Sequence, residues 1–212
     1  MENIVLQIVI VLGVILVSMT LHEVMHGLMA YWLGDDTAKE QGRLTLNPIK
    51  HIDPFLTVLL PIVLLVIGGP IFGGAKPVPF NPRRVRYDEF GAALVALAGP
   101  LVNLLIAFFT TGILVLFDPA AGSIAWTILV MTIQINIGFF VFNMLPIPPL
   151  DGSRVLYALA PNFVRRGMEV MEQFGLIVVF ALVMFAGSLL GRVMVTAIEN
   201  ITRFFVMIFG GV

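Results

Sequence analysis

Two histidines and a glutamate stand at a spacing that suits metal chemistry, in the segment His22-Glu23-Val24-Met25-His26. On a helix, His22 and His26 lie one turn apart on the same face, so both imidazoles can reach one metal ion. Glu23 lies beside them, where its carboxylate can hold a water molecule next to that ion. The chain contains no cysteine, so the metal must take its ligands from histidine, aspartate or glutamate. These residues predict a metal site that can activate water.

The sequence around this motif is apolar on both sides, from residue 4 to 20 and again from 28 to 33. A chance match at this spacing is expected in roughly one chain in a few hundred. Ionisable side chains inside a hydrophobic helix are costly unless they are partnered or solvated, so they seldom occur there without a function. The H-E-x-x-H pattern is typical of zinc peptidases, in which the glutamate is the general base.

The composition is that of a polytopic membrane protein. Of the 212 residues, 59% are hydrophobic and 12% are charged, and the mean hydropathy is +1.02. Such a chain could not cover its apolar surface with polar groups in water, so we expect it to lie in a lipid bilayer. The net charge of -1, without a basic stretch interleaved with aromatic residues, argues against nucleic acid as a partner. The first apolar segment is too long for the core of a signal peptide, so we expect it to remain as a helix.

Four apolar stretches are long enough to span a bilayer, which takes about 20 residues. They are residues 4–33, 90–117, 123–145 and 170–190. All 12 Lys and Arg residues lie outside these stretches, and neither the amino end nor the loop at 118–123 contains one. The positive-inside rule therefore places those two regions outside, and the loops at 34–53, 73–89 and 151–169 on the cytoplasmic side.

A fifth apolar run, residues 55–71, is shorter and is interrupted by Pro61 and by Gly68-Gly69-Pro70. Because the positive charges before and after it place both of its ends on the cytoplasmic side, we predict a re-entrant or interfacial segment. A complete fifth span is the alternative.

Two other segments have a recognisable pattern. Residues 38–48 partly alternate between polar and apolar side chains, which predicts a short strand or β-hairpin, with a plain surface loop as the alternative. An exposed strand edge at residues 40–47 could hold an extended peptide by main-chain hydrogen bonds. Near the carboxy end, polar side chains recur on one helical face, which predicts an interfacial amphipathic helix. These side chains are Arg192, Thr196, Glu199, Asn200 and Arg203.

The predicted fold is an all-α polytopic membrane protein. It has four to six transmembrane helices, a re-entrant or interfacial segment and a small β-hairpin. We expect residues 1–212 to form a single membrane-embedded domain, with a core at about 4–160 and C-terminal helices at 168–209.

A catalytic zinc takes three protein ligands and keeps one position open for water. The candidates for the third ligand are Asp151, Asp53 and His51. Asp151 follows a stretch with three prolines, which must break the helix, and broken backbone at membrane depth occurs where it is buried in protein or lines a wet cavity. Each candidate also has a purely structural interpretation: Asp151 and Asp53 as helix caps, and His51 as an interfacial side chain.

Asn103 is the only strongly polar side chain in the middle of the span at 90–117. It could form an interhelical hydrogen bond, or it could face the metal site and bind substrate backbone or a developing oxyanion. The spacing does not choose between the two. Gln134, Asn136 and Asn143 add polar groups near the core, and these could help water to reach the site.

Three motifs in this order resemble the site-2 protease family of intramembrane zinc metalloproteases. They are His22-Glu23-x-x-His26, Gly99-Pro100-x-x-Asn103 and Asn143-x-x-Pro146-x-Pro148-x-x-Asp151-Gly152. The resemblance covers roughly residues 15–160. It implies that His22, His26 and Asp151 bind one Zn2+ per chain and that Glu23 is the catalytic base. It further implies that Asn103 and Asn143 lie near the site as substrate-binding residues, and that the strand region after the first motif helps to present substrate.

Some family features are absent from the sequence. The chain has no room for the PDZ or nucleotide-sensing domain that many members carry, so it resembles the short members. Residues 74–79, Gly-Ala-Lys-Pro-Val-Pro, resemble a loop of those short members, but the sequence alone gives this loop no role.

The resemblance implies a multi-pass protein of a prokaryotic-type cell membrane that hydrolyses peptide bonds in or near transmembrane segments. Its expected substrates are membrane proteins or leftover signal peptides, cleaved near the cytoplasmic face. A membrane metal-ion transporter is one alternative, but transporters usually have polar partners on several spans and internal repeats. A zinc-binding protein without protease activity is the other, and the presence of Glu23 speaks against it. No motif encodes the substrate's identity or an oligomeric state.

Overall fold

The structure, a computed structural model, describes residues 2–66 and 73–210. Four of its helices are long and apolar enough to cross a membrane. They are α1 (Glu2–Trp32), α4 (Asp88–Phe117), α5 (Ile124–Asn143) and α8 (Gly175–Ile208). The first three agree with the predicted spans to within two residues at each end, so a multi-pass α-helical membrane protein is confirmed.

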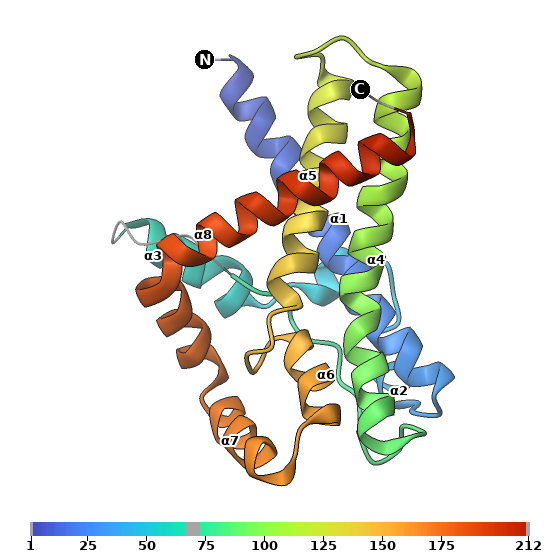
Figure 1. The fold of residues 1–212 in the computed structure, drawn as a ribbon, viewed down its shortest axis with the longest axis vertical. Coiled ribbons are helices and arrows are strands. Elements are labelled where there is room, and N and C mark those ends of the chain that lie inside the picture. Colours follow the sequence, from blue (N-terminus) through green and yellow to red (C-terminus); the bar gives the residue numbers. More distant parts are fainter. Residues whose placement is uncertain (1, 67–72, 211–212) are drawn as a thin grey trace.

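Helix α4 is the centre of the bundle, because it packs against α1, α5 and α8. Figure 1 shows α1, α4 and α5 as the long helices of the bundle and α8 crossing α5 and α4 diagonally. The first half of α4 buries a series of small residues, which lets the backbones of neighbouring helices approach closely. Further along, Ala107 of α4, Ile133 and Ile137 of α5 and Phe205 of α8 form a buried apolar cluster.

The remaining helices are short. They are α2 (Thr37–Glu40), the 3-10 turn η1 (Pro48–His51), the π-helical turn η2 (Pro54–Leu59), α3 (Leu60–Val66), α6 (Asp151–Leu159) and α7 (Asn162–Gln173). Figure 1 places α2, α6 and α7 at one end of the bundle, and the start of α1 and the end of α8 at the other. The described helical part of the predicted fifth run, η2 and α3 together, covers residues 54–66. Residues 67–71 of that run lie outside the described residues.

The predicted strand or β-hairpin at residues 38–48 is wrong, because the described residues contain no strand. The backbone hydrogen bonds there are local: the Gly42 N–H donates to the Lys39 carbonyl and the Arg43 N–H donates to the Ala38 carbonyl. Ala38 is fully buried and α2 packs against α1. Ala38 and Leu44 therefore lie against α1, whereas Leu46 is exposed, so the alternation does not reflect sheet pairing.

The C-terminal prediction also needs correction. The sequence predicted a span at 170–190 followed by a separate interfacial helix, but residues 175–208 form one continuous helix. No proline interrupts this segment, and the polar positions near its end do not break the helical hydrogen bonding.

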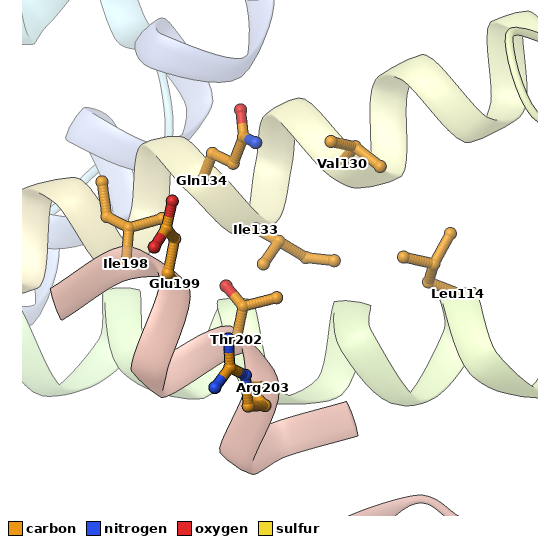
Figure 2. Close-up of a pocket in the computed structure, with 8 residues that line it drawn as sticks. All are labelled: Leu114, Val130, Ile133, Gln134, Ile198, Glu199, Thr202 and Arg203. Carbon is orange, nitrogen blue, oxygen red and sulfur yellow. The ribbon is translucent and has the colours of Figure 1, made fainter. Parts of the chain in front are cut away.

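A cavity of about 340 Å³ lies between α4, α5 and the end of α8 (Figure 2). Its apolar walls come from all three helices, and its polar side chains come from α5 and α8. The polar residues are Gln134, Glu199, Thr202 and Arg203, here called the α8 polar cluster. Within the described residues, none of them has a hydrogen-bond or ion-pair partner, and the Thr202 hydroxyl oxygen is buried.

Candidate metal centre

The two histidines of α1 meet a carboxylate from α6. His22 and His26 lie one helical turn apart, and their Nε2 atoms are 3.0 Å from each other. Asp151 Oδ2 lies 3.2 Å from Nε2 of His22 and 3.5 Å from Nε2 of His26. Each of the three side chains offers one ligand atom, and these atoms all lie within 4.8 Å of one another. Residues 125 positions apart in the sequence thus converge on one point.

Asp151 reaches this point because helix α5 ends at Asn143 and the chain turns through a proline-rich segment before α6 begins. Asp151 is the first residue of α6, and the cap position belongs to Leu150, so the Asp151 side chain does not act as the N-cap. Gly152 is required next to it, since a Cβ there would lie 2.8 Å from the Leu145 carbonyl oxygen. Helix α6 packs against α4, which fixes the carboxylate opposite α1.

The other two candidates for a third ligand are occupied elsewhere. The Asp53 carboxylate accepts hydrogen bonds from the backbone N–H groups of Phe55 and Leu56, so it is the N-cap of η2. His51 is fully buried, and its Nε2 donates to the carbonyl oxygen of Thr45. Of the three candidates, only Asp151 therefore lies beside both histidines, a distinction that the sequence spacing could not make.

The far nitrogen of each histidine is held by an acceptor. His26 Nδ1 lies 2.8 Å from the Val95 carbonyl oxygen, and His22 Nδ1 lies 2.6 Å from Asn103 Oδ1. A carbonyl oxygen only accepts, so each Nδ1 carries the proton and each Nε2 presents its lone pair to the common point. This is the tautomer that a metal ligand requires.

The orientation of Asn103 follows from a chain of hydrogen bonds. Asn136 Nδ2 donates to the Thr132 carbonyl and to the Ser18 hydroxyl, at 2.8 and 2.9 Å. Asn136 Oδ1 must then accept from Asn103 Nδ2, at 2.8 Å. That leaves Asn103 Oδ1 facing His22. We call Ser18, Asn103 and Asn136 the ligand-supporting network.

This arrangement differs from the predicted substrate-binding role of Asn103. Its side chain is fully buried, and both of its polar atoms are used by α1 and α5. It forms an interhelical hydrogen bond, and through that bond it orients a metal-site residue. Asn136, which we had expected to help water reach the site, belongs to the same network, and Gln134 lines the separate cavity by α8.

Gly99 closes the back of the site. A Cβ at this position would lie 2.7 Å from His22 Nε2 and even closer to His26 Nε2, so no larger residue fits. The missing side chain of Gly99 makes space for the two imidazoles and for an ion between them.

Glu23 and Asn143 lie at the open side. A cavity of about 260 Å³ is lined by His22, Glu23 and Asn143, and its other walls are largely apolar and come from η2, α3, α5 and α8. Asn143 Nδ2 donates to the Phe139 carbonyl, and this keeps the amide at the cavity wall. Glu23 Oε2 accepts a hydrogen bond of 2.8 Å from the backbone N–H of Val78.

The donor set suits zinc. Two imidazole nitrogens and one carboxylate oxygen are the ligands of many catalytic zinc sites, and all three converge with their free electron pairs. Asp151 Oδ2 is buried and has no hydrogen-bond partner in the described part of the chain, which is unfavourable unless a cation binds there.

Some functional contacts were not foreseen from the sequence. Ser18 lies four residues before His22, on the same helical face, so its spacing could have identified it. The backbone groups of Val95 and Val78 had no such signal, because any residue type supplies them.

Comparisons with known proteins agree with this geometry. Residues 113–186 match the model of peptidase family M50. The YwhC protein of Bacillus subtilis (strain 168), which is classed by name among the zinc metalloproteases, is 45% identical over 175 residues, which cover 79% of this chain and 77% of YwhC. The Rip2 protein of Mycolicibacterium smegmatis, classed in the same way, is 32% identical over 168 residues, which cover 79% of this chain and 63% of Rip2.

A third relative, the protein MJ0611 of Methanocaldococcus jannaschii, is also classed by name as a zinc metalloprotease and is 35% identical over 99 residues, or 47% of this chain. No solved structure matches the chain. The identity to YwhC over most of both chains is decisive: the chain belongs to peptidase family M50, the site-2 protease family, and is a zinc metalloprotease.

Proposed function

We propose that this protein cleaves peptide bonds in or near membrane-spanning segments, with Glu23 as the general base and His22, His26 and Asp151 as the ligands of one zinc ion. The observation that carries the proposal is the position of Glu23 and His22 on the wall of an apolar cavity inside the helix bundle. A carboxylate, a group of three potential metal ligands and a cavity meet there, and α1, which carries His22 and Glu23, is long and apolar enough to cross a membrane.

A zinc ion held by the triad supplies Lewis acidity, which polarises a scissile carbonyl and lowers the pKa of a water molecule toward about 7. Glu23 lies next to His22 in the helix and accepts the proton of that water, then returns it to the leaving amine. The hydrogen bonds of the histidines to Val95 and Asn103 hold the imidazoles in place while this occurs.

The cavity walls favour an apolar substrate. Leu56 and Leu60 face the site from η2 and α3, and Phe139 and Phe142 face it from α5. A helical substrate hides its peptide bonds, so it must unwind locally before attack, and these walls would accept its apolar side chains. Asn143 lines the same cavity, and this supports a role in hydrogen-bonding the exposed backbone of such a segment.

We further propose that residues 1–212 act as one membrane-embedded domain in a prokaryotic cell membrane, with η2 and α3 re-entering from the cytoplasmic side. The positive charges on both sides of this segment support re-entry. Cleavage near the cytoplasmic face follows, because the same charges place the far ends of α1 and α5 on that side.

The test compares wild type with Glu23→Ala, both purified in detergent, for zinc content and for cleavage of a model single-span substrate. We expect about one zinc per chain in both and cleavage by wild type alone, since Glu23 is a base and not a ligand. Zinc without cleavage by wild type on any membrane substrate would favour metal transport or an inactive zinc protein. Absence of zinc from both would overturn the metal site.

A further inference from the structure

We propose that residues 73–81, here called the strap, position the catalytic base by holding Glu23 Oε2 through the backbone N–H of Val78. This inference rests on the proposed function and gives a role to the Gly-Ala-Lys-Pro-Val-Pro loop. The hydrogen bond is 2.8 Å long, and Val78 is buried with 6% of its surface exposed. It joins two groups 55 residues apart in the sequence.

The strap is anchored at intervals along its length. The Gly74 N–H donates to the Leu56 carbonyl, and the Thr57 hydroxyl donates to the Gly74 carbonyl at 2.6 Å. Beyond Val78, the Asn81 N–H donates to the buried carboxylate of Asp35.

Lys76 is held through both of its backbone polar groups. Its N–H donates to the His51 carbonyl at 2.9 Å, and its carbonyl accepts from the Arg43 guanidinium at 2.8 Å. Arg43 and His51 are both buried. These fixed contacts one residue before Pro77 hold the strap in one path over α1.

The two prolines explain why a single donor is presented. Pro77 and Pro79 have no N–H, so Val78 carries the only backbone donor of this tripeptide. A residue that precedes proline is held in an extended conformation, and this applies to both Lys76 and Val78. The Pro-Val-Pro sequence thus fixes the direction of one N–H group without help from secondary structure.

The Val78 side chain is seated on the same helix as the metal motif. A Cβ at Gly27 would lie 2.8 Å from Val78 Cγ1 and 2.6 Å from Leu44 Cδ2, so the missing side chain of Gly27 makes the notch that Val78 fills. Gly27 directly follows His26. The strap is therefore held in a fixed position against the turn of α1 that carries Glu23.

The consequence for Glu23 is a fixed carboxylate plane. With Oε2 engaged by Val78, rotation of the carboxylate is restricted and Oε1 is left to serve the water. A hydrogen bond to an ionised acceptor is stronger than one between neutral groups, so this contact can select one rotamer. Val78 acts through Glu23 and does not touch the reacting atoms, so it is a positioning residue.

The first experiment needs neither zinc nor activity. In metal-free protein, hydrogen exchange is followed in a peptide covering residues 76–80, where the prolines leave only Val78 and Phe80 with exchangeable amides beyond the first residue. We expect the Val78 amide to be protected in wild type and in Glu23→Gln, whose amide oxygen still accepts. In Glu23→Ala the protection should fall by at least about 10-fold. Equal protection in all three proteins would overturn the contact.

The second experiment removes only the donor. Replacing the Val78 amide with an ester, by incorporating the α-hydroxy acid analogue of valine, should lower kcat by about 10- to 100-fold. KM and zinc content should stay within about twofold, because neither substrate binding nor the metal ligands are touched. The matched control is the same ester at Phe80, whose N–H has no hydrogen-bond acceptor among the described residues, and it should retain the kcat of wild type.

The outcomes separate the two proposals. Unchanged kcat in the Val78 ester, with Glu23-dependent protection still present, overturns positioning while protease function stands. A loss of zinc in the Val78 ester also overturns it, because the contact would then support the metal site as a whole. If wild type cleaves nothing although Val78 is protected by Glu23, the proposed cleavage in membrane-spanning segments falls, and the catalytic role of the strap falls with it.

Discussion

Two groups of polar side chains lie among the apolar helices, and they use their hydrogen-bonding capacity in opposite ways. In the ligand-supporting network, Ser18, Asn103 and Asn136 are buried and bonded to one another or to His22. In the α8 polar cluster, the side chains have no partner among the described residues, and three of the four are exposed. Helix α5 contributes to both groups, through Asn136 and Gln134, two positions apart.

This difference shows which polar residues of a membrane protein can hold other side chains in place. A buried amide with every partner in place has one low-energy orientation, so it can fix a metal-site imidazole. An unpartnered side chain at the surface of a helix keeps its rotamer freedom and fixes nothing. Activity should therefore depend on the network and be insensitive to the cluster.

The largest effect is expected at Asp151, whose carboxylate meets His22 and His26 at the metal site. Asp151→Ala removes one of three metal-site residues, so zinc content should fall from about one to below about 0.1 per chain, with complete loss of cleavage. Asp53→Ala is the matched control, because it removes a cap, costing about 1 kcal/mol of stability, and leaves the metal site intact. Elemental analysis of both purified proteins checks this. Retention of zinc by Asp151→Ala would show that the ligand set is wrong.

The next effect concerns the space that Gly99 leaves for the two histidines. Gly99→Ala places a methyl group against Nε2 of both histidines, so it should displace them and lower activity by at least about 100-fold. Gly138→Ala on α5 is the control, since the nearest atoms to its added Cβ are 3.9 Å away. Cleavage rates and zinc affinity of the two variants give the comparison. Full activity in Gly99→Ala would mean that the imidazoles do not occupy these positions in the working enzyme.

The third effect addresses the network itself. Asn103→Ala leaves His22 Nδ1 without its acceptor and should weaken zinc affinity by about 10- to 100-fold. Asn136→Ala acts one step further away and should have a smaller effect. The double variant should cost less than the sum of the single ones, because the two residues share one chain of bonds. Competition with a chelator measures these affinities, and strict additivity would indicate independent roles.

The sequence was informative where a residue type carries the chemistry. The first three spans followed from the length of the apolar runs, and His22 and His26 followed from helical spacing. Asp151 could be proposed from the prolines before it, but only the fold brings it to α1. The strap contact could not be predicted, because the donor is a backbone group. The hairpin prediction failed because residues 38–48 form local turns in which only Ala38 and Leu44 lie against α1, and periodicity alone does not identify the surface that a residue contacts.

The smallest effect is the sharpest test of the comparison, because it removes the same group, a hydroxyl, from each region. Ser18→Ala deletes the acceptor of Asn136 Nδ2 and leaves a buried donor unsatisfied, so it should lower the free energy of unfolding by about 1–3 kcal/mol. Thr202→Val deletes a buried hydroxyl that has no partner in the described chain and keeps the side-chain shape. It should therefore raise stability, by about 1 kcal/mol, without changing zinc content or cleavage. Thermal unfolding of the two variants in the same detergent shows whether each substitution raises or lowers stability. If Thr202→Val lowers stability instead, the Thr202 hydroxyl has a hydrogen-bond partner in the membrane. The α8 polar cluster would then be hydrogen-bonded, like the ligand-supporting network.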